Sequence, residues 1–207
     1  MNTISEDCSS VILAGGENRR MPVLKAFIDV NGETIIEKNL RIMKALFREN
    51  RIVTNQPEIY TFLGVPLLGD IYDTRGPMSG IVTALFNSSC NWIFVSACDM
   101  PFLNPCLIEY MVSKRRGCDA IVPVIHKKPE PLCALYSKRL FHSMENALLG
   151  GRKSLRDFLN SKRVKYINSS TIKTLDPGGL SFINLNTPQD IKRYLNPEDI
   201  SRFIKRS

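Results

Sequence analysis

Residues Ser10 to Lys25 read SVILAGGENRRMPVLK, and this stretch decides how the rest of the chain is interpreted. Its apolar run, 11–13, predicts a short buried strand, and two glycines follow this strand after Ala14. A strand that ends in glycines can turn sharply and lets a ligand approach backbone N–H groups closely. The arginines and the lysine beyond the glycines supply positive charge for a phosphate chain. We therefore interpret the stretch as a nucleoside triphosphate site.

The glycine pair Gly15-Gly16 is weak evidence by itself, because such pairs mark turns in many proteins. A P-loop would need glycine followed by Lys-Ser or Lys-Thr, and a dinucleotide site would need G-x-G-x-x-G; the stretch has neither. Considered alone, the stretch fits a tight turn followed by a solvated basic loop equally well.

The composition is that of a globular protein with an anionic partner. The chain has 207 residues, of which 43% are hydrophobic and 23% charged, and its net charge is +8. Such an excess favours a nucleotide, a phosphorylated substrate, a nucleic acid or a membrane surface as partner. The basic clusters lack interleaved aromatic residues, which disfavours nucleic acid.

Several features predict a cytoplasmic protein. The chain has no run of about 18 apolar residues, and its first residues, MNTISED, lack the pattern of a signal peptide. None of the six cysteines forms a C-x-x-C pair, which disfavours a zinc or redox site. We therefore expect reduced thiols, a cytoplasmic location and no membrane partner.

Hydrophobic patterning predicts alternating strands and helices in one domain, 1–207. Strands are expected at 27–30, 51–54, 65–68, 92–95, 120–124, 132–136, 165–168 and 181–185. Helices are expected from Thr34 through Phe47, at 57–63 and 78–87, from Asn104, at 138–149 and 154–159, and from Asn186 through Tyr194. The alternation indicates an α/β fold, in which a mostly parallel sheet carries helices on both faces.

Polar residues follow several of the expected strands, where sites in such sheets lie. Asp99 follows the most apolar strand and can hold a hard cation such as magnesium, although a helix cap or a buried acceptor would look the same. Asp70 can accept from the ring N–H and amino group of a base, and Asp73 competes for that role. Asn55 fits a turn residue as well as a ligand.

Basic residues after the expected helix 138–149 are candidates for contact with a substrate phosphate. Arg152 and Lys153 follow a glycine pair, and Arg156 lies one turn further on. A solvated helix start explains them better when they are taken alone.

A set of motifs runs through nearly the whole chain in a fixed order. In that order they are Leu13-Ala14-Gly15-Gly16, Arg20-Met21, Lys25, Asp70, Gly76 to Ile81, Trp92, Cys98 to Leu103, Glu130-Pro131-Leu132, Tyr136, Gly151-Arg152, Ser154 and Asn184 to Pro188. This ordered set resembles the molybdenum cofactor guanylyltransferases. Relatives that use CTP usually have Leu-Ala-Ala-Gly in the first motif, so Gly15 favours the guanylyl branch.

The resemblance implies a single-domain, three-layer, Rossmann-like nucleotidyltransferase fold. It also implies a reaction in which the terminal phosphate of molybdopterin attacks the α-phosphorus of GTP, pyrophosphate leaves and a guanine dinucleotide cofactor forms. The expected cofactor is magnesium. The expected partners are GTP, a molybdopterin-type phosphorylated acceptor, and molybdenum enzymes or proteins of cofactor biosynthesis. The nucleotide-binding half would be 1–104 and the acceptor-binding half 105–207.

The resemblance also assigns roles to single residues. The expected nucleotide-binding residues are Leu13, Ala14, Gly15, Gly16, Lys25, Asn55, Asp70 and Asp99. The expected catalytic residues are Lys25, Asp99 and Arg20, with Asp99 as the metal ligand. It places Asn184 and Asn186 on the acceptor, and the basic residues Arg152 and Lys153 complete the expected acceptor-binding set.

Two residues depart from the family pattern. Pro22 stands where the family usually has glycine, and Leu24 replaces a residue that is commonly polar. Proline fixes φ and removes an N–H, so the phosphate loop is expected to have a different shape. The alternatives are a nucleotidyltransferase of the same fold with another nucleotide or phosphorylated acceptor, or a non-catalytic nucleotide- or pterin-binding protein. Intact Lys25 and Asp99 argue against the non-catalytic protein.

Overall fold

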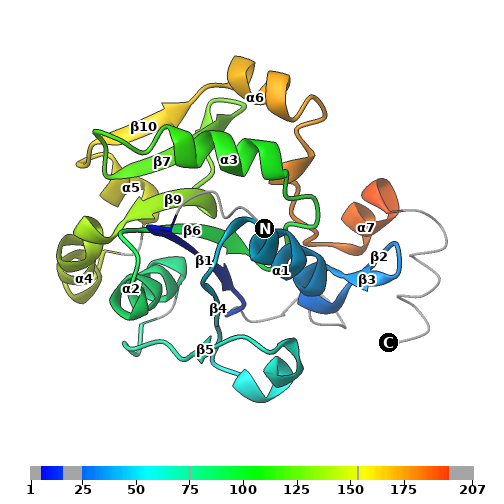
Figure 1. The fold of residues 1–207 in the computed structure, drawn as a ribbon, viewed down its shortest axis with the longest axis horizontal. Coiled ribbons are helices and arrows are strands. Elements are labelled where there is room, and N and C mark those ends of the chain that lie inside the picture. Colours follow the sequence, from blue (N-terminus) through cyan, green and yellow to red (C-terminus); the bar gives the residue numbers. More distant parts are fainter. Residues whose placement is uncertain (1–5, 16–24, 75, 153, 196–207) are drawn as a thin grey trace.

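The computed structural model describes residues 6–15, 25–74, 76–152 and 154–195. Figure 1 shows a central sheet between two layers of helices. Its strands are β1 (Cys8–Leu13), β4 (Asn50–Val53), β5 (Leu67–Leu68), β6 (Trp92–Ala97), β7 (Ala120–Ile125), β8 (Lys128–Pro129), β9 (Cys133–Ser137) and β10 (Val164–Ile167). The helices are α1 (Ile35–Leu46), α2 (Pro77–Asn87), α3 (Pro105–Ser113), α4 (Phe141–Leu149), α5 (Leu155–Leu159), α6 (Ser169–Leu175) and α7 (Pro188–Tyr194).

The sheet is mixed but mostly parallel. Its order is β10-β7-β9-β6-β1-β4-β5, and β8 pairs with β7. The pairs β1–β6, β1–β4, β4–β5 and β7–β10 are parallel, whereas β9 runs antiparallel to both β6 and β7. The predicted fold class is therefore confirmed.

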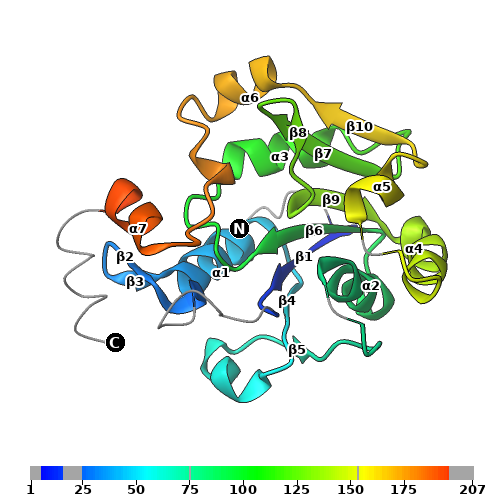
Figure 2. The ribbon, with the colours of Figure 1, turned by 180° about the vertical axis from the view of Figure 1, so that it is seen from behind.

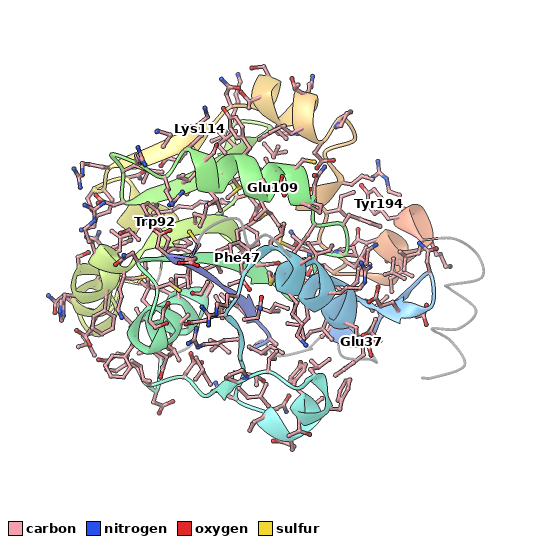
Figure 3. The ribbon with its side chains drawn as sticks, viewed as in Figure 1. Glu37, Phe47, Trp92, Glu109, Lys114 and Tyr194 are labelled. Carbon is pink, nitrogen blue, oxygen red and sulfur yellow. The ribbon has the colours of Figure 1, made fainter. Side chains whose placement is uncertain are left out.

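Two apolar cores lie on opposite faces of the sheet. The core under α1 and α3 includes Phe47, which Figure 3 labels. The ring of Phe47 stacks on Phe94 of β6 with centroids 5.9 Å apart. The core on the other face joins α2, α4 and α5 to the sheet (Figure 2). Because both faces are covered, the central strands are buried along their whole length: all six residues of β1 and all six of β6 are buried, Ser9, Ser10 and Ser96 among them.

Helix starts carry the caps that their sequences predict. Thr34 and Glu37 form a capping box at α1, in which each side chain meets the other's backbone N–H. At α3 the side chain of Asn104 accepts from the N–H groups of Cys106 and Leu107, and proline occupies the first turn. These caps fix where the helices leave the edge of the sheet.

Helix α2 packs unusually close to the sheet through Gly80. A Cβ at this position would lie 3.0 Å from Cδ2 of Leu13 and 3.5 Å from Cγ1 of Val53. The missing side chain lets α2 approach the ends of β1 and β4.

Some expected elements differ from the structure. Residues 181–185 form no strand: Leu180–Phe182 is a 3-10 turn (η5), and residues 183–187 are irregular. The carboxylate of Asp176 accepts from the N–H of Ser181 at 2.9 Å, which draws the chain into this turn. Helix α6 and the short hairpin strand β8 were not predicted, and the expected strand 27–30 divides into η1 (Lys25–Phe27) and β2 (Asp29–Val30), which pairs with β3 (Glu33–Thr34).

The thiols of the six cysteines are free, as expected. None of the helices in the described residues has the length and apolar character that a membrane crossing requires.

Candidate active site

The carboxyl ends of β1, β4, β5 and β6 meet at one edge of the sheet. Leu13 is in register with Val53 on one side and Ala97 on the other. Just beyond the strands, the N–H of Ala14 donates to Val53 O at 2.8 Å, and the N–H of Cys98 donates to Leu13 O at 3.1 Å. This pairing places the residues that follow these strands side by side, as predicted.

Lys25 and Asp99 come together at this edge. The Nζ of Lys25 lies 3.5 Å from Oδ2 of Asp99, and the two side chains are 22% and 17% exposed. Lys25 begins η1, a turn that is anchored by the buried Ala26 and by the ring of Phe27, which stacks on Tyr60 with centroids 5.4 Å apart. A cation and a carboxylate are thus held next to each other in a site that remains partly open to solvent.

The negative charge of the Asp99 carboxylate is only partly compensated by Lys25. Burial raises the pKa of Asp99, and the nearby Lys25 ammonium only partly opposes this rise. A positive ion beside this oxygen pair would favour its charged form. Within the described residues, no three His, Cys, Asp or Glu side chains form a group that could hold a metal ion, and the role of Asp99 as a metal ligand stays a prediction.

Asn55 and Asp70 form a reciprocal pair at the ends of β4 and β5. The Nδ2 of Asn55 donates to Oδ2 of Asp70 at 2.9 Å, and the N–H of Asp70 donates to Oδ1 of Asn55 at 3.0 Å. The second carboxylate oxygen of Asp70, Oδ1, is buried and has no hydrogen-bond partner in the described chain. Asp73, the alternative from sequence, is exposed. Asp70 therefore carries a buried acceptor that the described protein leaves unsatisfied.

The backbone at Gly15 is open to approach. A Cβ at this residue would meet no atom within 4 Å, and the residue is exposed. The packing of the described protein therefore does not require glycine here. The open space is compatible with a ligand that lies against the main chain.

Asn186 joins the site from the far end of the sequence. Its Oδ1 accepts from the Nζ of Lys25, and the N–H of the preceding Leu185 donates to Asp99 O at 3.0 Å. Asn184 lies two residues earlier, half-buried. The structure thus brings part of the expected acceptor-binding set into contact with the expected catalytic pair.

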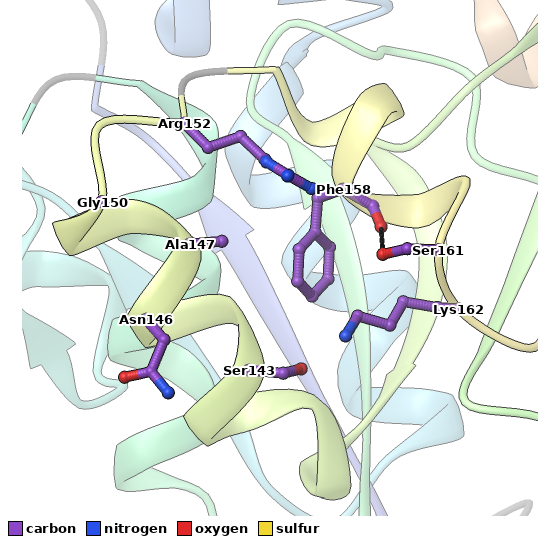
Figure 4. A pocket seen from close by; sticks show the side chains of 8 residues that line it. All are labelled: Ser143, Asn146, Ala147, Gly150, Arg152, Phe158, Ser161 and Lys162. Atoms are coloured by element: carbon purple, nitrogen blue, oxygen red, sulfur yellow. Dashed lines mark hydrogen bonds between the residues drawn. The ribbon is translucent and has the colours of Figure 1, made fainter.

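Arg152 lies elsewhere. It lines a pocket of about 330 Å³ between α4 and α5, and its side chain extends from the loop after α4 toward α5 (Figure 4). Figure 1 shows α4 and α5 on the left of the molecule and α7 on the right. The structure therefore does not bring Arg152 together with Asn186. The other residues that line the pocket are Ser143, Asn146, Ala147, Gly150, Phe158, Ser161 and Lys162.

Several predicted site residues lie outside the described residues. They are Gly16, Arg20 and Lys153, together with the departures Pro22 and Leu24. Their roles stay predictions.

A family model described as a MobA-like NTP transferase domain matches residues 10–166. The chain belongs to this family. The match begins within β1, ends within β10 and so includes the edge that carries Lys25 and Asp99. The predicted family is confirmed.

The relatives of this MobA-like chain carry consistent names. It is 35% identical over 183 residues to a probable molybdenum cofactor guanylyltransferase from Pelotomaculum thermopropionicum. The aligned region covers 88% of this chain and 89% of that protein. It is 34% identical over 187 residues to the molybdenum cofactor guanylyltransferase of Desulfosudis oleivorans, with 89% and 93% covered.

Solved structures support the fold of this MobA-like chain. Molybdopterin-guanine dinucleotide biosynthesis protein A from Archaeoglobus fulgidus matches with a TM-score of 0.78 at 28% identity, over 95% of this chain and 99% of that one. A 4-diphosphocytidyl-2C-methyl-D-erythritol synthase from Anaerococcus prevotii matches with a TM-score of 0.69 at 15% identity, over 96% of both chains. The second likeness shows the fold alone.

Glu130 is a candidate site residue to which the sequence interpretation gave no role. Burial raises the pKa of Glu130, and the charge of Asp99 raises it further, whereas Arg156 lowers it. A buried ionisable group with a raised pKa is a candidate for a functional site, which is why Glu130 is named here. The only sequence signal was its place in the Glu130-Pro131-Leu132 motif.

Proposed function

We propose that this protein transfers GMP from GTP to the terminal phosphate of molybdopterin and releases pyrophosphate. In this reaction a bond forms between an acceptor phosphate oxygen and the α-phosphorus, and the bond from the α-phosphorus to the oxygen that bridges to the β-phosphate breaks. The product is a guanine dinucleotide form of the cofactor. The names of relatives at 34–35% identity over most of their length support the proposal.

The observation that carries the proposal is the Lys25–Asp99 pair at the carboxyl edge of the sheet, with 3.5 Å between Nζ and Oδ2. Phosphoryl-type transfer requires little covalent chemistry from the protein and depends on positioning and charge stabilisation. The Lys25 ammonium would bind phosphate oxygens and offset the negative charge that moves to the leaving pyrophosphate. Arg20 would add to this charge, and Leu13 to Gly16 would offer backbone to the nucleotide.

The residues present fit a magnesium ion. Magnesium prefers oxygen ligands and is usually held by one or two carboxylates together with substrate phosphates rather than by a protein cage. Asp99 supplies such a carboxylate, and burial raises its pKa, so the pocket favours a compensating cation. When bound, the ion would neutralise charge on the phosphates.

Asn55 and Asp70 would recognise guanine. The reciprocal pair fixes the Asp70 carboxylate, and its Oδ1 has no partner within the described protein. Guanine presents a ring N–H and an amino group side by side, which a carboxylate can accept together. A buried acceptor that a ligand satisfies discriminates strongly against ligands that lack the donor.

On the acceptor side, Asn184, Asn186, Arg152 and Lys153 would serve the molybdopterin substrate, and the halves 1–104 and 105–207 would divide the two roles. The separation between Arg152 and Asn186 means that an acceptor would need to reach both places, or that the two serve different groups. A cytoplasmic location and partner proteins of cofactor biosynthesis remain predictions.

The test is thermal melting with magnesium and each of GTP, CTP, ATP and UTP. A nucleotide at about 100 times its dissociation constant adds about 2.7 kcal/mol, or roughly 5–10 °C in Tm for a chain of this size. We expect this shift with GTP alone. Asp70→Asn should reduce the preference for GTP, whereas Asp73→Asn, at an exposed neighbour, should leave it intact.

Product formation completes the test. With GTP, magnesium and molybdopterin, the wild-type chain should release pyrophosphate and form a guanine dinucleotide, and Asp99→Ala should not. Selective stabilisation by CTP would contradict the guanine assignment. The absence of any nucleotide response would favour a non-catalytic protein.

A further inference from the structure

The segment before α7 reaches the Lys25–Asp99 pair at two points. The N–H of Leu185 donates to Asp99 O at 3.0 Å, and Oδ1 of Asn186 accepts from Lys25 Nζ. We infer that Asn186 is a positioning residue that holds the Lys25 ammonium in place for the triphosphate, an inference that rests on the proposed function. This role lies on the nucleotide side of the reaction and differs from the contact with the acceptor that the family resemblance implies.

Asn186 is itself firmly held. Its backbone N–H donates to Oδ2 of Asp190 at 3.0 Å, and the same oxygen accepts from the N–H of Thr187 at 2.8 Å, within the capping box of α7. The preceding Leu185 is fully buried in a small core with Ile28 and Ile191. The amide is therefore mounted on backbone that is fixed on both sides.

Lysine needs such a support because its side chain is flexible. A four-carbon stem loses much rotamer freedom when its end is held in one place. Asp99 alone would draw the ammonium onto the carboxylate, where it would compete with a bound cation. The amide oxygen of Asn186 is neutral, so it holds the ammonium without cancelling its charge.

The hydrogen-bonding capacity of the ammonium agrees with this role. It has three donors, and its described partners are Asp99 and Asn186. One donor is left for a phosphate oxygen. The Nδ2 of Asn186 has no partner in the described chain, so contact with an acceptor remains open to it and the two roles need an experiment to separate them.

The experiment measures GTP binding in the absence of any acceptor, by calorimetric titration of the full chain with magnesium and GTP. Four proteins form a double-mutant cycle: wild type, Asn186→Ala, Lys25→Met and the double variant. We expect Asn186→Ala to weaken GTP binding about tenfold, as the loss of a charge-assisted hydrogen bond implies. In the Lys25→Met background the same change should have almost no effect, because Asn186 acts through the lysine.

Gln189→Ala is the matched control. Gln189 is exposed near the start of α7, and its substitution should leave GTP binding unchanged. Thermal melting of each variant without ligand verifies that it folds. If Asn186→Ala does not fold, Asn186→Leu takes its place in the cycle.

Two results would overturn the inference. The first is a GTP affinity of Asn186→Ala within about twofold of wild type, which would leave Asn186 with the acceptor alone. The second is an equal loss in the presence and absence of Lys25, which would indicate a merely structural effect. If wild type binds another nucleotide instead, the guanine assignment fails and the cycle is decided with that nucleotide. If wild type binds no nucleotide, the proposed function and the inference both fail.

Discussion

Replacing Lys25 by methionine should destabilise the protein at neutral pH and much less in acid. With 3.5 Å between Nζ and Oδ2, Coulomb's law at an effective dielectric constant of about 20 gives an attraction of about 5 kcal/mol. The measurable loss is smaller, because the Lys25 and Asp99 side chains keep 22% and 17% exposure and water replaces part of the attraction. Exposed pairs contribute about 0.2–1 kcal/mol, and breaking a buried pair costs about 3–5 kcal/mol. For this partly buried pair we expect a loss of about 2 kcal/mol.

The pH dependence identifies the cause. Burial raises the pKa of Asp99 above its ordinary value of 3.8. A raised carboxyl pKa means that the folded state holds the proton more tightly, so this stability is present at low pH and is lost as the pH rises through the folded pKa. Removing Lys25 raises the pKa of Asp99 further. The deficit of Lys25→Met should therefore be small while Asp99 is protonated and should grow as Asp99 ionises.

Urea unfolding at about pH 4 and about pH 7.5 measures this difference. Lys173→Met, at an exposed lysine of α6, is the control and should have little effect at either pH. Adding Asp99→Asn to Lys25→Met should remove most of the pH dependence. Equal deficits at both pH values, or a similar deficit in the control, would refute the electrostatic argument.

Two further predictions concern packing. Tyr136→Phe removes the buried hydroxyl that donates to Pro131 O at 2.7 Å. We expect the free energy of unfolding, measured with urea, to fall by about 1–3 kcal/mol. The control Tyr166→Phe, at a residue that is 44% exposed, should change it little. Gly80→Val places a Cβ 3.0 Å from Cδ2 of Leu13. We expect about 1–3 kcal/mol of destabilisation and a smaller Tm shift with GTP. An unchanged melting curve would contradict this and would show that the Leu13 side chain moves away without cost.

Much of the sheet could be predicted because buried parallel strands leave a strong signal. Apolar runs such as 92–95 appear as continuous hydrophobic segments, and this run lies within β6. Strand direction carries no such signal. All five residues of β9 are buried, as in a parallel strand, although β9 runs antiparallel between β6 and β7. The direction of β9 depends on the hairpin-like path of the chain through β8. The prolines in this segment interrupt the pattern that would have predicted a strand there.

The missed elements were decided by side-chain contacts with the backbone. At 181–185 the alternation of apolar residues indicated a strand, but Asp176 holds Ser181 in a turn, and Leu185 bonds to Asp99 O instead of a ladder partner. At α6 the cap was visible in the sequence: Asn168 accepts from the N–H of Thr171 at 2.9 Å. The segment is short, and a helix of one or two turns has little periodicity to detect.

The candidate site divides in the same way. Residues that follow parallel strands could be placed together from sequence alone, because the ends of those strands must meet; Asn55, Asp70 and Asp99 are examples. The contact between Lys25 and Asn186 spans 161 positions and depends on the path of an irregular segment, so no local pattern predicts it. The candidate site therefore has one side at the sheet edge, fixed by ladder hydrogen bonds, and a second side that depends on a few anchored loop residues. Substitutions at Asn186 or Leu185 should therefore change the position of the Lys25 ammonium more than they change the sheet. For this reason the double-mutant cycle measures GTP affinity rather than the free energy of unfolding.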